Sequence, residues 1–402
     1  MKKKLLAGLM SAIAISGNAV ADTSIEDKLA VLQEEIEHLK LQMAEADKNR
    51  SGGIQGFADR TTVGGYGELH YNNYSGDVAS GATRDKDEID FHRFVLFFGH
   101  KFNDWISLKS ELEIEHSNTE NGGAVELEQA YLDFNINKQL NAKVGIFLIP
   151  MGLLNETHEP PTFYGVERNQ IETRIIPSTW WEAGVGVYGE ALPGLNYQFN
   201  LTSSPDANDF SSPSKGFREM RQNVAEAPAE NMGVSGALNY QGIPGLLVGA
   251  AFFTGNTGQD NAAIGDARLT LWDVHARYNV GKLDLRALYA QGHLGDADKV
   301  AVETGNDAPE KIKGWYAEAA YHVWKQGDHD LAPFVRYESW DTHAEVPSNV
   351  TRNDAFKNHV WTVGANYWPH PQIVLKADYQ NYDKPDGDKG DKRVNMGMGY
   401  MF

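Results

Sequence analysis

The chain ends with Val394-Asn-Met-Gly-Met-Gly-Tyr-Met-Phe402, in which every second residue from Val394 to Phe402 is apolar. An apolar residue at every second position is typical of a β-strand with one apolar face. A soluble domain has no physical need of such a strand at its end, whereas a closed barrel must pair its last strand with its first. The stretch therefore predicts an antiparallel β-barrel that is closed by its carboxy-terminal strand.

The amino-terminus predicts export. Three lysines at positions 2–4 precede an apolar run over residues 5–15, and Ala19-Val20-Ala21 provides small residues for cleavage. We therefore expect a signal peptide over residues 1–21. Its removal would take away three lysines and change the formal net charge from −19 to −22. So acidic a chain is unsuited to bind nucleic acid.

Bulk composition favours strands over helices as the membrane-crossing elements. No run of eighteen apolar residues follows the signal peptide, and the mean hydropathy is −0.46. Barrels look hydrophilic by composition because half of each strand faces water, and the 17 Tyr and 9 Trp suit aromatic girdles. The absence of cysteine excludes disulfides, thiolate metal sites and cysteine nucleophiles.

From residue 63 onward the apolar period is two, in sixteen segments of the length that a tilted membrane strand needs. The expected strands are 63–72, 89–100, 105–116, 125–135, 142–149, 181–191, 195–203, 233–241, 246–254, 269–280, 282–291, 314–324, 331–341, 359–368, 372–382 and 392–402. Short connections alternate with longer, acidic ones. We predict an all-β fold, a 16-stranded antiparallel transmembrane β-barrel over residues 62–402, in the Gram-negative outer membrane among lipid and lipopolysaccharide.

One face of the strands is charged, which predicts a water-filled lumen. The lumen-wall residues proposed on this parity are Lys109, Glu111, Glu113, Glu115, Glu126 and Glu128. Along the whole barrel, fourteen acids and at most eight bases face inward, which favours cations over anions. The alternation fails at Arg93, which falls on the lipid-facing parity. A β-bulge or a protomer interface would explain this failure.

The longest connection, residues 150–179, carries four prolines and both signs of charge. Loops of this length are uncommon without a purpose. We expect it to fold into the lumen and to form the pore constriction with Glu167, Arg168, Glu172 and Arg174. Arginines that face glutamates there would create a transverse field. The alternative is an external cap.

Residues 22–49 place apolar side chains at alternating steps of four and three, from Ile25 to Met43. This heptad stripe predicts a short coiled-coil helix, which the linker 50–61 joins to the barrel. The stripe covers less than three heptads. Self-association, packing against another surface and tethering to the cell wall all remain open.

Three stretches carry a resemblance to a known family. Asp90-Phe-His-Arg-Phe-Val-Leu-Phe-Phe-Gly-His100, Val125-Glu-Leu-Glu-Gln-Ala-Tyr-Leu-Asp133 and Lys143-Val-Gly-Ile-Phe-Leu-Ile-Pro-Met-Gly152 resemble the phosphate-selective porin O and P family. The resemblance is strongest over residues 66–189. It implies a homotrimer of sixteen-stranded channels, with anion transfer along an arginine ladder and a lysine-lined constriction.

The acid-rich lumen departs from that family pattern. We therefore expect an outer-membrane porin that allows passive diffusion of small hydrophilic solutes and ions. An anion- or phosphate-selective channel is the alternative. Clustered arginines would be needed to desolvate phosphate, and the inward bases cannot be placed in one file.

Catalytic and metal signals are weak. No spacing of Ser, His and Asp indicates a triad, so we predict no enzyme, although barrel enzymes exist. Gly184-Val-Gly-Val-Tyr-Gly189 matches a dinucleotide fingerprint but lies in an expected strand. The acidic stretch 383–391 fits a solvated loop that divalent ions bridge to lipopolysaccharide better than an EF-hand. The histidines form no zinc motif, and we predict no metal site and no cofactor.

Overall fold

The computed structural model describes residues 37, 53–75, 86–120, 122–383 and 390–402. By contacts the chain divides into two units, Met1–Arg60 and Thr61–Phe402. In the first unit, helix α2 (Gly53–Ala58) lies within the segment expected as the linker 50–61. The predicted signal peptide 1–21 and, apart from Glu37, the predicted coiled-coil helix 22–49 lie outside the described residues.

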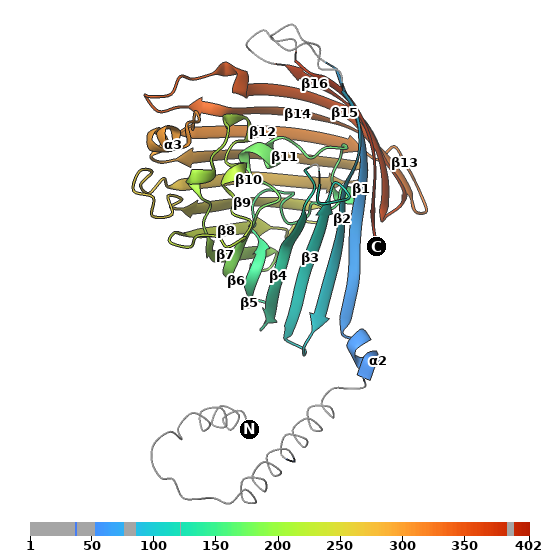
Figure 1. Cartoon of the computed structure of the whole chain (residues 1–402). Helices are drawn as coiled ribbons and strands as arrows, with labels where there is room; N and C mark the ends of the chain where they lie inside the picture. Colours follow the sequence, from blue (N-terminus) through green and yellow to red (C-terminus); the bar gives the residue numbers. More distant parts are fainter. Residues whose placement is uncertain (1–36, 38–52, 76–85, 121, 384–389) are drawn as a thin grey trace, which may run out of the picture. The chain divides into compact units, whose positions relative to one another are not determined.

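The second unit is one antiparallel sheet whose first strand pairs with its last (Figure 1). Its strands are β1 (Thr61–Ser75), β2 (Lys86–Lys101), β3 (Ile106–Glu115), β4 (Val125–Asn135), β5 (Asn141–Leu148), β6 (Trp181–Leu192), β7 (Leu195–Ser203), β8 (Met232–Tyr240), β9 (Leu246–Gly255), β10 (Leu269–Val280), β11 (Leu283–Leu294), β12 (Lys311–Tyr321), β13 (Trp324–Gln326), β14 (His329–Glu345), β15 (Lys357–His370), β16 (Ile373–Asp383) and β17 (Lys392–Met401). Each expected strand overlaps one of these. β13 only extends the hairpin between β12 and β14, so the sixteen-stranded barrel is confirmed.

Helical segments are confined to the connections. They are η1 (Pro160–Thr162), η2 (Ile171–Ile175), η3 (Ala207–Asp209), η4 (Pro213–Lys215), η5 (Arg218–Met220), α3 (Ala297–Thr304) and η6 (Asp354–Phe356). Among the described residues, no helix is both long and apolar enough to cross a membrane. In Figure 1, α3 lies at one end of the barrel and the β13 hairpin at the other. Because the strands alternate in direction, the longer loops leave from the α3 end.

The carboxy-terminal strand closes the barrel, as its alternation predicted. β17 pairs with β1 from Tyr66 opposite Met401 to Ser75 opposite Lys392. Next to the pair of Tyr66 with Met401, the Phe402 amide donates to the Gly65 carbonyl at 2.9 Å and the Gly65 amide donates to the Phe402 carbonyl at 3.1 Å. The closure therefore pairs residues 65–75 of β1 along the edge that faces β17.

Gly65 allows β1 and β2 to approach each other, and Gly65→Ala should lower the yield of folded barrel several-fold. The added methyl group would lie 2.2 Å from the Val95 carbonyl oxygen, so the backbones of β1 and β2 would have to separate. The folded fraction can be measured as the compact species on unheated SDS gels. Gly99→Ala is the matched control, because its methyl group would be crowded by the rotatable hydroxyl of Thr62 at 2.5 Å, while the Leu108 carbonyl oxygen would lie 3.7 Å away. Equal yields for the two variants would contradict this account.

A β-bulge resolves the irregular parity at Arg93. The pairing of β1 with β2 shifts register between Glu68 and His70, so that one additional residue of β2 is accommodated there. Arg93 consequently points inward, with Nε 2.7 Å from Glu68 and Nη1 3.2 Å from Glu113. Of the two explanations offered for Arg93, the bulge is the one that the structure shows. The outer face keeps apolar side chains, of which Leu112 and Leu201 are exposed examples.

Candidate pore constriction

The loop between β5 and β6, residues 149–180, lies inside the barrel. The Gly152 amide donates to Asp273 of β10 at 3.1 Å, and the Val166 amide donates to Asp378 of β16 at 2.7 Å. These two strands are well separated in the order of the sheet. The loop therefore crosses the lumen instead of lying only above it.

Most of the inward carboxylates of β10 to β16 already have partners. Arg336 bonds Glu338 through Nε at 2.9 Å and Glu318 through Nη1 at 3.1 Å, and all three side chains are buried. Arg286 lies 3.0 Å from Asp284 in the same way. The excess of acids in the sequence therefore overstates the negative field that a solute would meet in the lumen.

Arg336 also fastens the loop to the wall. Its Nη1 donates to the Tyr164 carbonyl at 3.1 Å and its Nη2 donates to the Glu167 carbonyl at 3.4 Å. The same guanidinium thus holds two wall carboxylates and two loop carbonyls. A buried cation with this many acceptors has most of its lost hydration replaced by the protein.

His158 fastens the other side of the loop to β3 and β4. Its Nε2 lies 3.4 Å from Glu111 and 3.4 Å from Glu128, while its Nδ1 lies 3.0 Å from the Asn155 carbonyl. Burial alone would lower the pKa of His158, but the two carboxylates raise this pKa to about 10. The side chain is therefore a buried imidazolium at neutral pH.

Raising the pH through about 10 should loosen this attachment. Because the pKa of His158 in the folded protein lies above its ordinary value of 6.5, the stabilisation is fully present below pH 6.5 and is lost as the pH rises through about 10. Single-channel conductance should change in that interval for the wild type. His158→Gln, which cannot titrate, should lack that step. A step of the same size in both proteins would assign it to other groups.

The structure separates the four charges that were expected to face one another at the constriction. Glu167 accepts from Asn72 at 2.9 Å and lies 3.1 Å from His70, both on β1. Glu172 is fully buried, which raises its pKa, and it accepts from the Leu153 and Leu154 amides at 2.5 and 2.7 Å. The prediction that Glu172 opposes an arginine is wrong, because its carboxylate instead satisfies amides of its own loop.

The two arginines of that set point in different directions. Arg168 donates to the Thr179 hydroxyl at 3.0 Å and to the His158 carbonyl at 3.3 Å. Arg174 donates to the Gln170 side chain at 2.6 Å and to the Ser214 carbonyl. Only Arg168 belongs to the group of charges described next.

Arg218 and Arg221, from the loop over residues 204–231, join Arg168 in what we term the arginine cluster. Arg218 donates to the Ser178 carbonyl and Arg221 to the Thr179 carbonyl, so both arginines bind the β5–β6 loop. Burial, together with the positive charges of Arg221 and Arg168, lowers the pKa of Arg218 to about 9. Among the described residues, none of these three arginines has an ion-pair partner within 4.0 Å.

Three wall carboxylates form an acidic patch close to the arginine cluster. Oxygens of Glu113, Glu115 and Glu126, from β3 and β4, lie within 4.8 Å of one another. Burial lowers the pKa of Arg221, and Glu126 is the carboxylate that most opposes this effect. The cluster and the patch are thus close enough to influence each other without contact.

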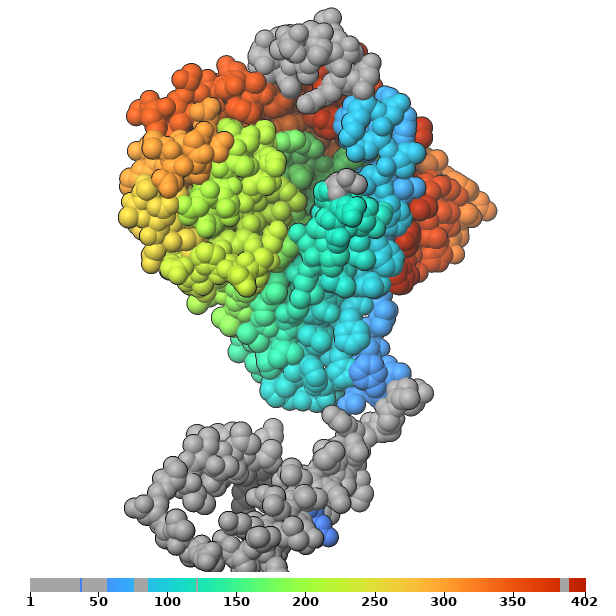
Figure 2. All heavy atoms as spheres, in the orientation of Figure 1, coloured from blue at the N-terminus to red at the C-terminus, as the bar shows by residue number. Residues whose placement is uncertain are grey.

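The remaining lumen-wall residues have other roles. Glu111 and Glu128 are buried against His158, and Lys109 is a half-exposed partner of Asp133 at 2.7 Å. In Figure 2, atoms of the loops over residues 149–231, coloured green to yellow-green, fill much of the barrel opening. Sequence reasoning missed Arg218 and Arg221, because no period marks a loop arginine that contacts a second loop.

A closed antiparallel barrel with an apolar outer face and a polar interior crossed by its own loop is a channel of the outer-membrane type. The chain belongs to the Gram-negative porin family, because the sequence model of the family described as Gram-negative porin matches residues 8–387. As a member of this family of channels, it is an outer-membrane diffusion channel and not an enzyme.

The chain is 35% identical over 347 residues to an uncharacterized protein of Aquifex aeolicus (strain VF5), covering 81% of this chain and 77% of the relative. Its fold resembles the anion-selective porin from Comamonas acidovorans, with a TM-score of 0.55, 13% identity and coverage of 85% and 99% of the two chains. It also resembles the trimer form of OmpT from Vibrio cholerae, with a TM-score of 0.51, 13% identity and coverage of 86% and 100%.

Proposed function

We propose that this porin lets small hydrophilic solutes and ions diffuse passively through a constriction between the arginine cluster and the acidic patch. The observation that carries the proposal is the proximity of three arginines without ion-pair partners to three wall carboxylates. Charges of opposite sign on two sides of a narrow passage create a transverse field. Such a field orients dipolar solutes and favours their entry over that of apolar ones.

The charges along the path support weak ion selectivity. Many wall acids are paired with wall arginines or with loop amides, so they do not attract cations as free carboxylates do. The arginine cluster then faces mainly Glu115 and Glu126 of the acidic patch, because Glu113 is paired with Arg93. We expect a general diffusion channel with a small preference for one sign of ion.

A second candidate is the anion- or phosphate-selective channel of the porin O and P family. It is favoured by one observation, the guanidinium groups of Arg168, Arg218 and Arg221 that no described carboxylate neutralises. Arginine is the side chain best suited to bind phosphate oxygens in pairs. The acidic patch beside these arginines counts against this candidate.

We also propose a homotrimer, as the resemblance to the porin O and P family implies. Support comes from the fold similarity to OmpT, whose structure is described as a trimer form. On the outer face of β2, Phe94 is followed at every second position by Leu96 and Phe98, both of which are exposed apolar side chains. Cross-linking of the protein in native membranes should give a species of three chains. A monomer alone would contradict the proposal.

Solute entry tests the proposed constriction. Liposomes that contain the purified porin should admit a zwitterionic amino acid faster than a neutral solute of equal size, as measured by osmotic swelling. Converting Arg168, Arg221, Glu115 and Glu126 to glutamines should remove this difference. Slower entry of the zwitterion in the wild type would contradict the transverse field.

A further inference from the structure

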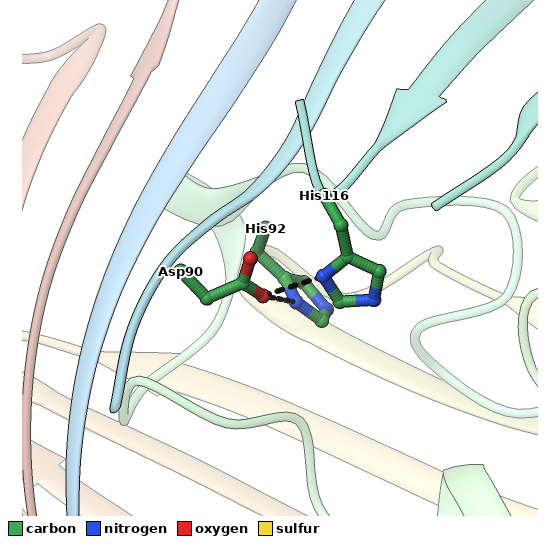
Figure 3. A group of neighbouring side chains, drawn as sticks. All are labelled: Asp90, His92 and His116. Atoms are coloured by element: carbon green, nitrogen blue, oxygen red, sulfur yellow. Dashed lines mark hydrogen bonds and ion pairs between the residues drawn. The ribbon is translucent and has the colours of Figure 1, made fainter. Parts of the chain in front are cut away.

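Two histidines and one aspartate meet on the inner side of β2 and β3 (Figure 3). Asp90 and His92 belong to β2, and His116 follows the last residue of β3. One oxygen of Asp90 lies 2.9 Å from His92 Nδ1 and 2.8 Å from His116 Nδ1. The three candidate ligand atoms all lie within 4.8 Å of one another. Both rings direct the same nitrogen toward the carboxylate.

The positions of the two imidazoles are fixed by their surroundings. The His116 amide donates to the His92 carbonyl at 3.1 Å, so the two backbones are joined at this point. The ring of His70 stacks on that of His92, with centroids 4.7 Å apart and planes 14° from parallel. His70 itself lies between Glu68 at 3.2 Å and Glu167 at 3.1 Å. The cluster therefore has a preset geometry.

We propose that Asp90, His92 and His116 bind a divalent transition-metal ion of the Zn²⁺ type. Two imidazole nitrogens and one carboxylate oxygen form a ligand set that such ions prefer, whereas Ca²⁺ and Mg²⁺ prefer oxygen alone. Ligands about 2.1 Å from a tetrahedral ion are roughly 3.4 Å apart. The observed separations of 2.9 and 2.8 Å would therefore have to widen by roughly half an ångström, which small side-chain rotations allow. Water would complete the coordination.

This cluster suits an exchangeable ion better than the other histidine cluster does. The side chains of Asp90, His92 and His116 are 21%, 27% and 37% exposed, so an ion and its waters can reach them. The cluster of His158 with Glu111 and Glu128 is instead fully buried and fastens the β5–β6 loop.

The site is coupled to the channel through His70. Glu167 belongs to the β5–β6 loop and contacts the histidine that stacks on His92. A bound dication would add two positive charges beside this loop and repel other cations from the passage. The metal is thus expected to shift the ion preference of the open channel toward anions. Metal binding itself does not depend on the proposed constriction.

Co²⁺ binding to the purified detergent-solubilised porin tests the proposal, because the visible absorption of Co²⁺ reports nitrogen ligation directly. We expect saturable binding of one ion per chain, displaced by Zn²⁺. His116→Asn and His92→Asn should each weaken binding by at least about tenfold, the scale at which even residues that only support metal ligands act. His329→Asn is the matched control, since His329 lies in the hairpin that contains β13 and belongs to no three-residue cluster of this kind among the described residues.

Failure of the wild type to bind Co²⁺ or Zn²⁺, or equal binding by the double variant His92→Asn/His116→Asn, would overturn the proposal. Because His116 lies outside the paired strand, its single variant is expected to fold, as unheated SDS gels can verify. A second readout needs no variant. Zn²⁺ should shift the zero-current potential of the wild-type channel toward anions, and a chelator should reverse the shift. If Co²⁺ binds but the zero-current potential does not change, the metal site would be supported and its effect on the ion preference of the channel would be excluded.

Discussion

Replacing Arg168 and Arg221 by glutamate should raise the permeability of K⁺ relative to Cl⁻ by about tenfold. Two unit charges roughly 6 Å apart in water interact by about 0.7 kcal/mol. Reversing one charge changes this energy by about 1.4 kcal/mol, a factor of about ten, for K⁺ and by the same amount in the opposite sense for Cl⁻. Reversing two charges changes the free energy by more than reversing one, and screening by salt reduces the combined effect. The zero-current potential of the channel in a planar bilayer under a KCl gradient measures the effect.

Three further variants make this prediction specific. Arg168→Gln/Arg221→Gln removes the charge without reversing it and should give about half of the shift in free energy. Glu115→Gln/Glu126→Gln should move the potential in the opposite direction. Lys325→Glu reverses an exposed charge in the hairpin at the other end of the barrel and should have little effect. Equal shifts for Lys325→Glu and the arginine pair would place the selectivity elsewhere.

Arg336→Met should destabilise the barrel by about 3–5 kcal/mol, since it leaves Glu318 and Glu338 buried without their cation. The loop would also lose the hydrogen bonds to the carbonyls of Tyr164 and Glu167. We therefore expect a lower unfolding midpoint in denaturant and a larger single-channel conductance.

Compensating substitutions distinguish two causes of the lost stability, the unpaired buried carboxylates and the loss of packing at position 336. Adding Glu318→Gln and Glu338→Gln to Arg336→Met should recover much of the lost stability, because neutral amides are less costly to bury than carboxylates. Arg268→Met is the matched control, since Arg268 is exposed and its side chain donates, within the described part of the chain, only to Thr254 and Asn256. A similar loss of stability for Arg268→Met would contradict the assigned role of the buried network.

The barrel was predictable because its rules are local. A period of two determines which side chains face lipid, and the alternation of short with long connections determines the topology. The failed parity at Arg93 left a bulge or a protomer interface as explanations, and the register shift between β1 and β2 shows the bulge.

The site was less predictable, because the alternation of side chains along a strand shows which face each side chain lies on but not which residue it contacts. Glu111 was correctly placed on an inward face, yet its burial against His158 depends on a loop about forty-seven residues away in the sequence. The burial of Glu172 beneath amides of its own loop has no periodic signal. Arg218 and Arg221 came from a loop with no predicted role. Only the tertiary structure brings His116 to Asp90 and His92.

The zero-current potential of the wild-type porin under a KCl gradient, before and after addition of phosphate, tests the central claim most directly. An opposed arginine cluster and acidic patch predict a small potential of either sign, with no block of the chloride current by phosphate. A large potential that reports anion preference, together with block by phosphate, would contradict this account. It would show that the arginine cluster acts without opposition and would support the phosphate-selective alternative.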